Sequence, residues 1–164
     1  MTIYDEEQVL RLCESSRTAA IRALTKIRIF CGTEPSFSGL GGWVFEQTVQ
    51  YCLRKELNAR RAQVATIAEQ GKVGSRIRAD LLVGRAAVEI KQSGLYSSSA
   101  IAKYGQYRRA ANAQGLEYLF ITGGERYQPY RDGITKALGK ENVFFLDQNG
   151  DWKRFVARVI QLGQ

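Results

Sequence analysis

The sequence predicts an α/β protein, a three-layer α/β/α sandwich with a mixed central sheet and an N-terminal helical extension. From about residue 61 onward, short runs of strand-forming residues alternate with amphipathic segments, an order typical of helices packed on a sheet. Two of these runs are joined only by Gly84 and Arg85, a linker so short that they are expected to pair antiparallel. With 164 residues, of which 45% are hydrophobic, the chain has the length of one compact domain.

Residues 1–30 are expected to form the N-terminal helical extension. Apolar residues recur at three- and four-residue spacing within Tyr4 to Glu14 and again within Arg17 to Ile29. The two serines between these segments are available as helix caps. Cys31 to Gly42 is rich in Gly and Ser, so we expect a loop there.

The other elements lie in a core domain expected over residues 39–164. In chain order they are a helix over Gly42–Leu57, strands over Arg61–Glu69, Ile77–Val83 and Ala86–Gln92, a helix over Ser98–Gln114, a strand over Leu116–Thr122, a helix over Tyr127–Leu138, a strand over Val143–Leu146 and a helix from Asp151. Asp151 is expected to cap the last helix, which carries Trp152, Phe155, Val156, Val159 and Ile160 on one stripe.

The composition narrows the class of partner. A formal net charge of +8 favours a polyanion such as nucleic acid. The chain has no histidine, and its three cysteines show no CxxC spacing, so a zinc site is not expected. No apolar run reaches the length of about 18 residues that a transmembrane helix needs, and the acidic N-terminus does not resemble a secretory signal. We therefore expect a cytoplasmic protein that does not bind membranes.

The segment from Arg78 to Gln92 carries the candidate chemistry. Side chains two apart on a strand share a face, so Glu89 and Lys91 should point the same way. A tight hairpin can bring Asp80 of the preceding strand beside Glu89. Two carboxylates at one end of an apolar sheet repel each other unless a cation lies between them, and Mg²⁺ or Mn²⁺ suits oxygen ligands. The alternative interpretation is an exposed cross-strand charge pair.

Glu46 is a further candidate for this site. On the helix expected over Gly42–Leu57, it lies close to the apolar stripe that should face the sheet. A carboxylate there needs a partner, which a nearby metal site would supply. The alternative is a glutamate that reaches solvent from the edge of the stripe.

In this order of motifs the chain resembles the PD-(D/E)xK nuclease superfamily, which has a restriction-endonuclease-like fold. The resemblance covers roughly Gly39 to Ile160, and the aspartate followed by Glu-x-Lys on the next strand is its most specific part. Ala79 stands where the signature has proline. The sequence is similar to Holliday junction resolvases, to small homing and restriction endonucleases, and to the nuclease domains of bacterial polymorphic toxins.

The resemblance implies a role for each matching residue. It makes Asp80, Glu89 and the carbonyl of Ile90 ligands of Mg²⁺ or Mn²⁺, and Lys91 the catalytic lysine. Glu46 becomes an accessory acid. Gln106 on the following helix matches a glutamine of the family less closely, and the alternative for Gln106 is an ordinary solvent-facing residue.

Six basic residues around this segment are candidates for phosphate contacts: Arg76, Arg78, Arg85, Lys103, Arg108 and Arg109. Tyr104 and Tyr107 interleave with the last three, and we expect these tyrosines in the core rather than stacked on bases.

The sequence therefore predicts a metal-dependent endonuclease that hydrolyses DNA phosphodiesters, and the resemblance implies that the product carries a 5′-phosphate. One alternative is an interbacterial toxin domain, delivered to a target cell, that cuts DNA or RNA and is neutralised by an immunity protein. Another is a nucleic-acid-binding module without catalysis. A homodimer is the geometric expectation if both strands of a duplex are cut symmetrically.

Overall fold

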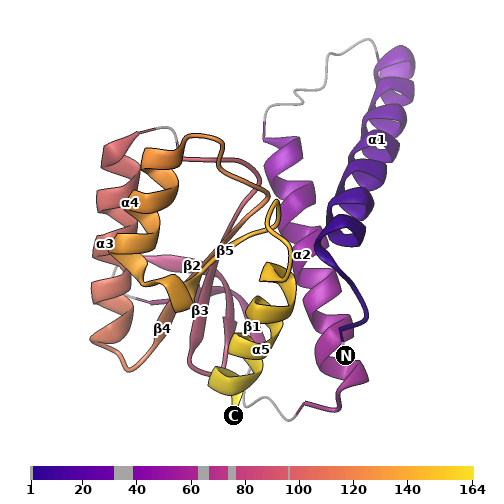
Figure 1. The fold of residues 1–164 in the computed structure, drawn as a ribbon. Coiled ribbons are helices and arrows are strands. Elements are labelled where there is room, and N and C mark those ends of the chain that lie inside the picture. Colours follow the sequence, from indigo (N-terminus) through magenta and orange to yellow (C-terminus); the bar gives the residue numbers. More distant parts are fainter. Residues whose placement is uncertain (1, 32–38, 63–66, 74–76, 96) are drawn as a thin grey trace.

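The protein has an α/β fold built on one five-stranded sheet (Figure 1). The computed structural model describes residues 2–31, 39–62, 67–73, 77–95 and 97–164, and the side chains of residues 27–31 and 67 are not described. The described helices are α1 (Glu6–Cys31), α2 (Leu40–Ala59), α3 (Ser98–Asn112), α4 (Gln128–Leu138), the 3-10 helix η1 (Lys140–Asn142) and α5 (Asp151–Gly163). The described strands are β1 (Ile67–Lys72), β2 (Arg78–Val83), β3 (Ala86–Lys91), β4 (Glu117–Thr122) and β5 (Val143–Phe145).

The sheet is mixed, with its strands in the order β1-β2-β3-β4-β5. The first three strands form antiparallel neighbours, and β3, β4 and β5 run parallel to one another. Because a parallel neighbour requires a crossover, α3 connects β3 to β4 and α4 connects β4 to β5. The carboxyl ends of β3, β4 and β5 consequently meet at one edge of the sheet.

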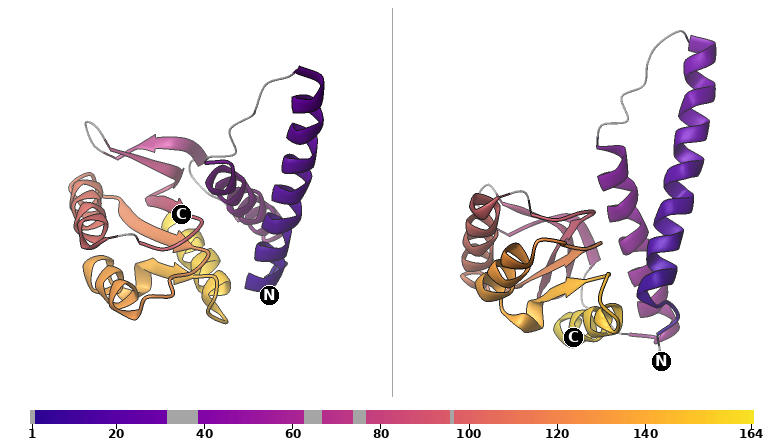
Figure 2. Two further views of the ribbon diagram at one scale, coloured as in Figure 1. Left: turned by 90° about the horizontal axis from the view of Figure 1, so that it is seen from above. Right: turned by 45° about the horizontal axis from the view of Figure 1, so that its top comes forward.

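Helices cover both faces of the sheet, which makes three layers (Figures 1 and 2). α2 and α5 share a buried apolar cluster with one face, in which Trp152, Phe155 and Leu53 are fully buried. α3 and α4 share a second cluster with the other face, centred on Tyr118 and Phe120. The alternation of side chains along β4 explains this division, since Leu119 joins the first cluster and its neighbours the second.

The N-terminal extension differs from the expected pair of helical segments, because α1 is one continuous helix. Ser15 does not interrupt it; its hydroxyl donates to the Leu12 carbonyl inside the helix, a local bond that keeps the serine compatible with helical backbone. The first half of α1 packs on α2 through Val9 and Cys13. Its second half extends beyond the sheet domain (Figure 2).

Two further expectations need correction. The strand expected over Arg61–Glu69 begins at Ile67 as β1. Asp151 does not cap α5, because Gly150 occupies the N-cap position and the Asp151 carboxylate accepts a 2.8 Å hydrogen bond from the backbone N–H of Phe145. In the part of the chain that is described, no helix has the length and apolar character needed to cross a membrane.

Candidate active site

The candidate site lies where the β2–β3 pairing ends. The register between the two strands runs from Val83↔Ala86 to Leu81↔Val88. Beyond this point the Asp80 side chain connects the two strands, because its Oδ2 accepts a 2.7 Å hydrogen bond from the backbone N–H of Ile90. The tight turn and the strand alternation thus bring Asp80 beside β3, as the sequence predicts.

Glu89 is the most buried acid of the site, with 7% of its side chain exposed. Its Oε1 lies 2.7 Å from the Nζ of Lys91, and its Oε2 accepts a 3.1 Å hydrogen bond from the Tyr118 hydroxyl. The Lys91 side chain is 40% exposed. The lysine therefore links the buried carboxylate to the solvent, where a substrate can approach.

Glu46 on α2 completes an acidic cluster with Asp80 and Glu89. Burial raises the pKa of the Glu46 carboxyl above its ordinary value, and the negative charge of Asp80 raises it further, against the opposing charge of Lys91. Its Oε1 also accepts a 3.1 Å hydrogen bond from Gln50. α2 is therefore positioned so that a third carboxylate acts on the same site.

Burial and the neighbouring Asp80 likewise raise the pKa of Glu89, although Lys91 and Tyr118 favour its charged form. Burial by itself lowers the pKa of Lys91, but the charge of Glu89 and the hydrogen bond to it outweigh this, so the pKa of the ammonium lies above its ordinary value. Among the described residues, one lysine thus faces three acids, and this part of the site favours additional positive charge.

The donor atoms of this cluster fit a hard divalent cation. Asp80 and Glu89 supply carboxylate oxygens, and Oδ1 of Asp80 has no hydrogen bond within the described part of the chain. The N–H and C=O of a strand residue point to the same side, so the Ile90 carbonyl also faces β2 past the end of the ladder. Among the described residues, no three His, Cys, Asp or Glu side chains form a metal-holding group. A cation here would therefore complete its coordination with the carbonyl and water, as Mg²⁺ commonly does.

The α3 helix contributes fewer of the expected residues than the sequence suggested. Gln106 is exposed and lies two positions from the buried Tyr104, so it is on the opposite side of the helix from the sheet. The structure does not bring Gln106 to the cluster. Lys103 is also exposed, with its ammonium 5.5 Å and 5.2 Å from the ring centroids of Tyr104 and Tyr107.

The arginines expected to contact phosphate are distributed over the molecule. Arg78 is exposed near the site and lies 3.4 Å from the Gln70 carbonyl. Arg85 lies in the β2–β3 turn, six residues from Lys91 along an extended strand, which corresponds to about 20 Å. Arg108 donates to the Ala137 carbonyl and so joins α3 to α4. Arg109 is exposed in the last turn of α3.

Of these residues, Arg78 lies two positions from Asp80 on β2, and Lys103 adjoins Tyr104, whose pKa is affected by burial and by the charges of Lys91 and Glu89. Arg76 falls outside the described residues.

Two tyrosines that the sequence did not place in the site belong to its surroundings. Tyr118 contacts Glu89 directly, and burial is the main cause of its pKa lying well above the ordinary value. Burial raises the pKa of Tyr104 to about 12, while the charge of Lys91 acts in the opposite direction. Tyr118 pairs with Ala87 across the parallel β3–β4 ladder, two residues from Glu89 on the same face. Strand parity would have identified it, once β4 was known to lie next to β3.

The fold and the site together define an α/β protein with an acidic cluster, served by one lysine, at the end of a β-hairpin. Compared with family models, curated proteins and solved structures, the chain matches none.

Proposed function

We propose that this protein is a metal-dependent nuclease that hydrolyses DNA phosphodiester bonds. The observation that carries the proposal is the ion pair between Glu89 and Lys91 at the end of a hairpin, near enough to the carboxylates of Asp80 and Glu46 for the charges of these groups to interact. A structural ion pair needs no further acids. Two additional carboxylates raise the cost of burying the pair, and a bound cation offsets that cost.

Asp80, Glu89 and the Ile90 carbonyl would hold the cation. When bound, a divalent ion supplies a Lewis acid for the scissile phosphate. Lys91 is solvent-accessible on one side and anchored to Glu89 on the other, so its ammonium can orient the attacking water and stabilise negative charge that develops on the phosphoryl oxygens. Hydrolysis adds water across the P–O3′ bond and leaves a 5′-phosphate and a 3′-hydroxyl.

Several coarser features support the same class of enzyme. The three-layer architecture and the antiparallel hairpin that carries Asp80 and Glu89 are compatible with a restriction-endonuclease-like fold. The net charge of +8 suits a polyanionic substrate. Arg78 and Lys103, both exposed near the cluster, are the basic residues we assign to the substrate backbone.

The test is cleavage of supercoiled plasmid, linear duplex, a four-way junction and structured RNA, each with Mg²⁺, Mn²⁺ or EDTA. We expect metal-dependent cutting of DNA that falls about a thousandfold in Lys91→Ala, because the variant loses a group that acts on the transition state. Lys136→Ala, an exposed lysine on α4, is the matched control and should cut normally. Undiminished cutting by Lys91→Ala would refute the assignment, and a preference for RNA would change the substrate.

A further inference from the structure

A cavity of about 510 Å³ opens at the carboxyl ends of β3, β4 and β5, next to the candidate active site. Its wall includes Gln92, which directly follows Lys91, and Gly123, whose backbone N–H donates a 3.2 Å hydrogen bond to the Lys91 carbonyl. Asp80, Glu89 and Lys91 themselves do not line it. The cavity is thus distinct from the candidate active site but adjoins the end of β3, the strand that carries the proposed catalytic lysine.

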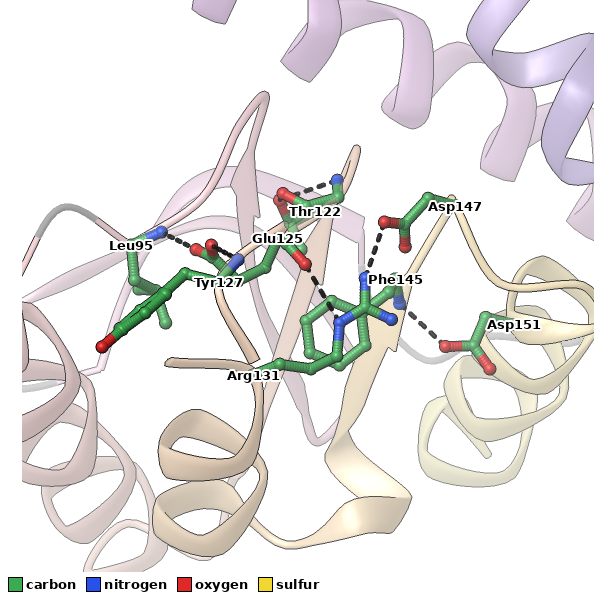
Figure 3. A network of polar contacts seen from close by, with 9 residues as sticks. Leu95, Thr122, Glu125, Tyr127, Arg131, Phe145, Asp147 and Asp151 are labelled. Atoms are coloured by element: carbon green, nitrogen blue, oxygen red, sulfur yellow. Dashed lines mark hydrogen bonds and ion pairs between the residues drawn. The ribbon is translucent and has the colours of Figure 1, made fainter. Parts of the chain in front are cut away.

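One wall of the cavity is fixed by Glu125, which is buried (Figure 3). Its Oε2 accepts a hydrogen bond from the backbone N–H of Leu95, and its Oε1 accepts a 2.9 Å bond from that of Tyr127. A side chain at Gly94 would collide with this carboxylate. Glu125 therefore joins the loop after β3 to the start of α4. Its carboxylate is occupied by these two backbone N–H groups, so we assign it a structural role rather than contact with a ligand.

The opposite wall is fixed by Arg131 (Figure 3). Its guanidinium lies 2.6 Å from Oδ2 of Asp147, donates a 3.1 Å hydrogen bond to the Glu125 carbonyl, and stacks 4.3 Å from the Phe145 ring centroid. A Cβ at Gly124 would lie 2.8 Å from Oδ2 of Asp147, so the glycine leaves room for this carboxylate. Asp147 is oriented through one oxygen, and Oδ1 stays open.

Three polar groups of the lining remain available to a ligand. Within the described residues, no hydrogen bond or ion pair engages Oδ1 of Asp147, the side-chain amide of Gln92 or the guanidinium of Arg126. The Asp147 oxygen is a hydrogen-bond acceptor, the Gln92 amide is both donor and acceptor, and the Arg126 guanidinium is a cationic donor. A free phosphate suits this set poorly, because Asp147 would repel it. A nucleobase, which carries donors and acceptors on one edge and is followed by a phosphate, matches all three.

We infer that this cavity binds an unstacked base of the substrate strand and prefers a base with an exocyclic amino group. The inference rests on the proposed function, since the base would belong to the nucleotide beside the scissile phosphate at the proposed cation site of Asp80 and Glu89. The amino group of cytosine or adenine donates to Asp147, and Arg126 contacts the neighbouring phosphate. Thymine has carbonyl oxygens at both corners of its Watson–Crick edge, so the carboxylate can accept only from the N3–H between two oxygens that it repels.

The test measures equilibrium binding of fluorescent oligo(dC), oligo(dT) and an abasic oligomer, each about 12 nucleotides long, in EDTA. Wild type should bind oligo(dC) about fivefold more tightly than oligo(dT), the worth of about one hydrogen bond. Asp147→Ala should abolish this preference while keeping affinity for the abasic oligomer. Arg126→Ala should weaken binding of all three oligomers. Asp132→Asn, on the exposed surface of α4, is the matched control.

The outcomes separate this inference from the nuclease proposal. Equal binding of oligo(dC) and oligo(dT) by wild type, or a preference retained in Asp147→Ala, overturns the base site even if the protein cuts DNA. A preference for oligo(dC) that Asp147→Ala removes supports the base site. If the same protein does not cut any substrate with Mg²⁺, only the nuclease proposal is overturned. Absence of binding to any oligomer overturns the base site as well.

Discussion

Two buried glutamates, Glu56 and Glu89, sit in opposite kinds of surroundings. Glu56 on α2 is fully buried, and its Oε1 accepts hydrogen bonds from the backbone N–H groups of Ile3 and Tyr4, at 2.7 and 2.9 Å, and from Nε1 of Trp152 at 3.3 Å. Its Oε2 lies 3.5 Å from Nε of Arg60. Glu89 instead contacts one lysine and one tyrosine, and the charges of two further carboxylates act on the same cluster.

The difference separates a structural acid from a candidate catalytic one. Three fixed donors converge on Oε1 of Glu56, so this carboxylate holds the N-terminal segment against α2 and α5. Among the described residues, the surroundings of Glu89 carry more negative than positive charge, and the pKa values of Glu46 and Glu89 are both raised. A chain that needed only stability would gain nothing from this excess. We therefore assign function to the Glu89 cluster and stability to Glu56.

The largest stability effect is expected at Glu56. Glu56→Ala leaves the buried Nε1 of Trp152 and two backbone N–H groups without their acceptor, which should lower the free energy of unfolding by about 3 kcal/mol. Urea denaturation followed by tryptophan fluorescence measures this. Glu69→Ala removes an exposed ion pair with Arg54 and should change stability by less than about 1 kcal/mol. An equal effect of both variants would contradict the role given to Glu56.

A pH-dependent effect, smaller than that of Glu56→Ala up to about pH 10, should appear at Cys52, which lies one turn before Glu56 on α2. Burial and the charge of Glu56 raise the pKa of the Cys52 thiol from 9.0 to about 12. Between these values the unfolded chain releases the thiol proton and the folded chain retains it, so the free energy of unfolding falls as pH rises. The slope is about 1.4 kcal/mol per pH unit for this group.

Urea denaturation of wild type and Cys52→Ala at several pH values above 9 isolates this contribution. The variant should lose stability less steeply than wild type, whatever its stability at neutral pH. Identical slopes would show that the thiol ionises in the folded protein. Cys13→Ala serves as a comparison, since burial also raises the pKa of its thiol.

The smallest effect is expected at Tyr118, the hydrogen-bond donor to Glu89. Tyr118→Phe keeps the buried ring and removes only the 3.1 Å bond, so stability should fall by about 1 kcal/mol. If Tyr118 orients Glu89 for catalysis, the cleavage rate should also fall, by about tenfold. Tyr130→Phe, on α4, should leave the rate unchanged. A Tyr118→Phe variant with the wild-type rate would confine Tyr118 to a packing role.

The sequence predicts the cluster of Asp80, Glu89 and Lys91 well, because that prediction needs only the two-residue period of a strand and a two-residue turn. The same turn explains why Arg85 lies away from the site, since a hairpin puts its turn at the far end of both strands. Tyr118 depends on the parallel register of β3 and β4, which single-sequence patterns do not specify.

Other features depend on contacts between segments distant in the sequence. Helical spacing places Glu56 on the apolar stripe of α2 with Val49 and Leu53, but its partners lie more than fifty residues away, so the local pattern does not identify them. The continuity of α1 depends on the Ser15 hydroxyl bonding within the helix, where the sequence also allows a cap. Around the cavity, the bond between Leu95 and Glu125 likewise joins the loops after β3 and β4, and the ion pair between Arg131 and Asp147 joins α4 to the loop after β5.

The most direct test of the central claim compares Glu89→Gln with Glu56→Ala in two assays, metal-dependent plasmid cleavage and urea unfolding. Glu89→Gln should lose about a thousandfold in cleavage rate and change the free energy of unfolding by less than about 1 kcal/mol. Glu56→Ala should show the reverse, with lower stability and near-normal cleavage at temperatures where it stays folded. Cleavage by Glu89→Gln at the wild-type rate would contradict the assignment of function to the Glu89 cluster.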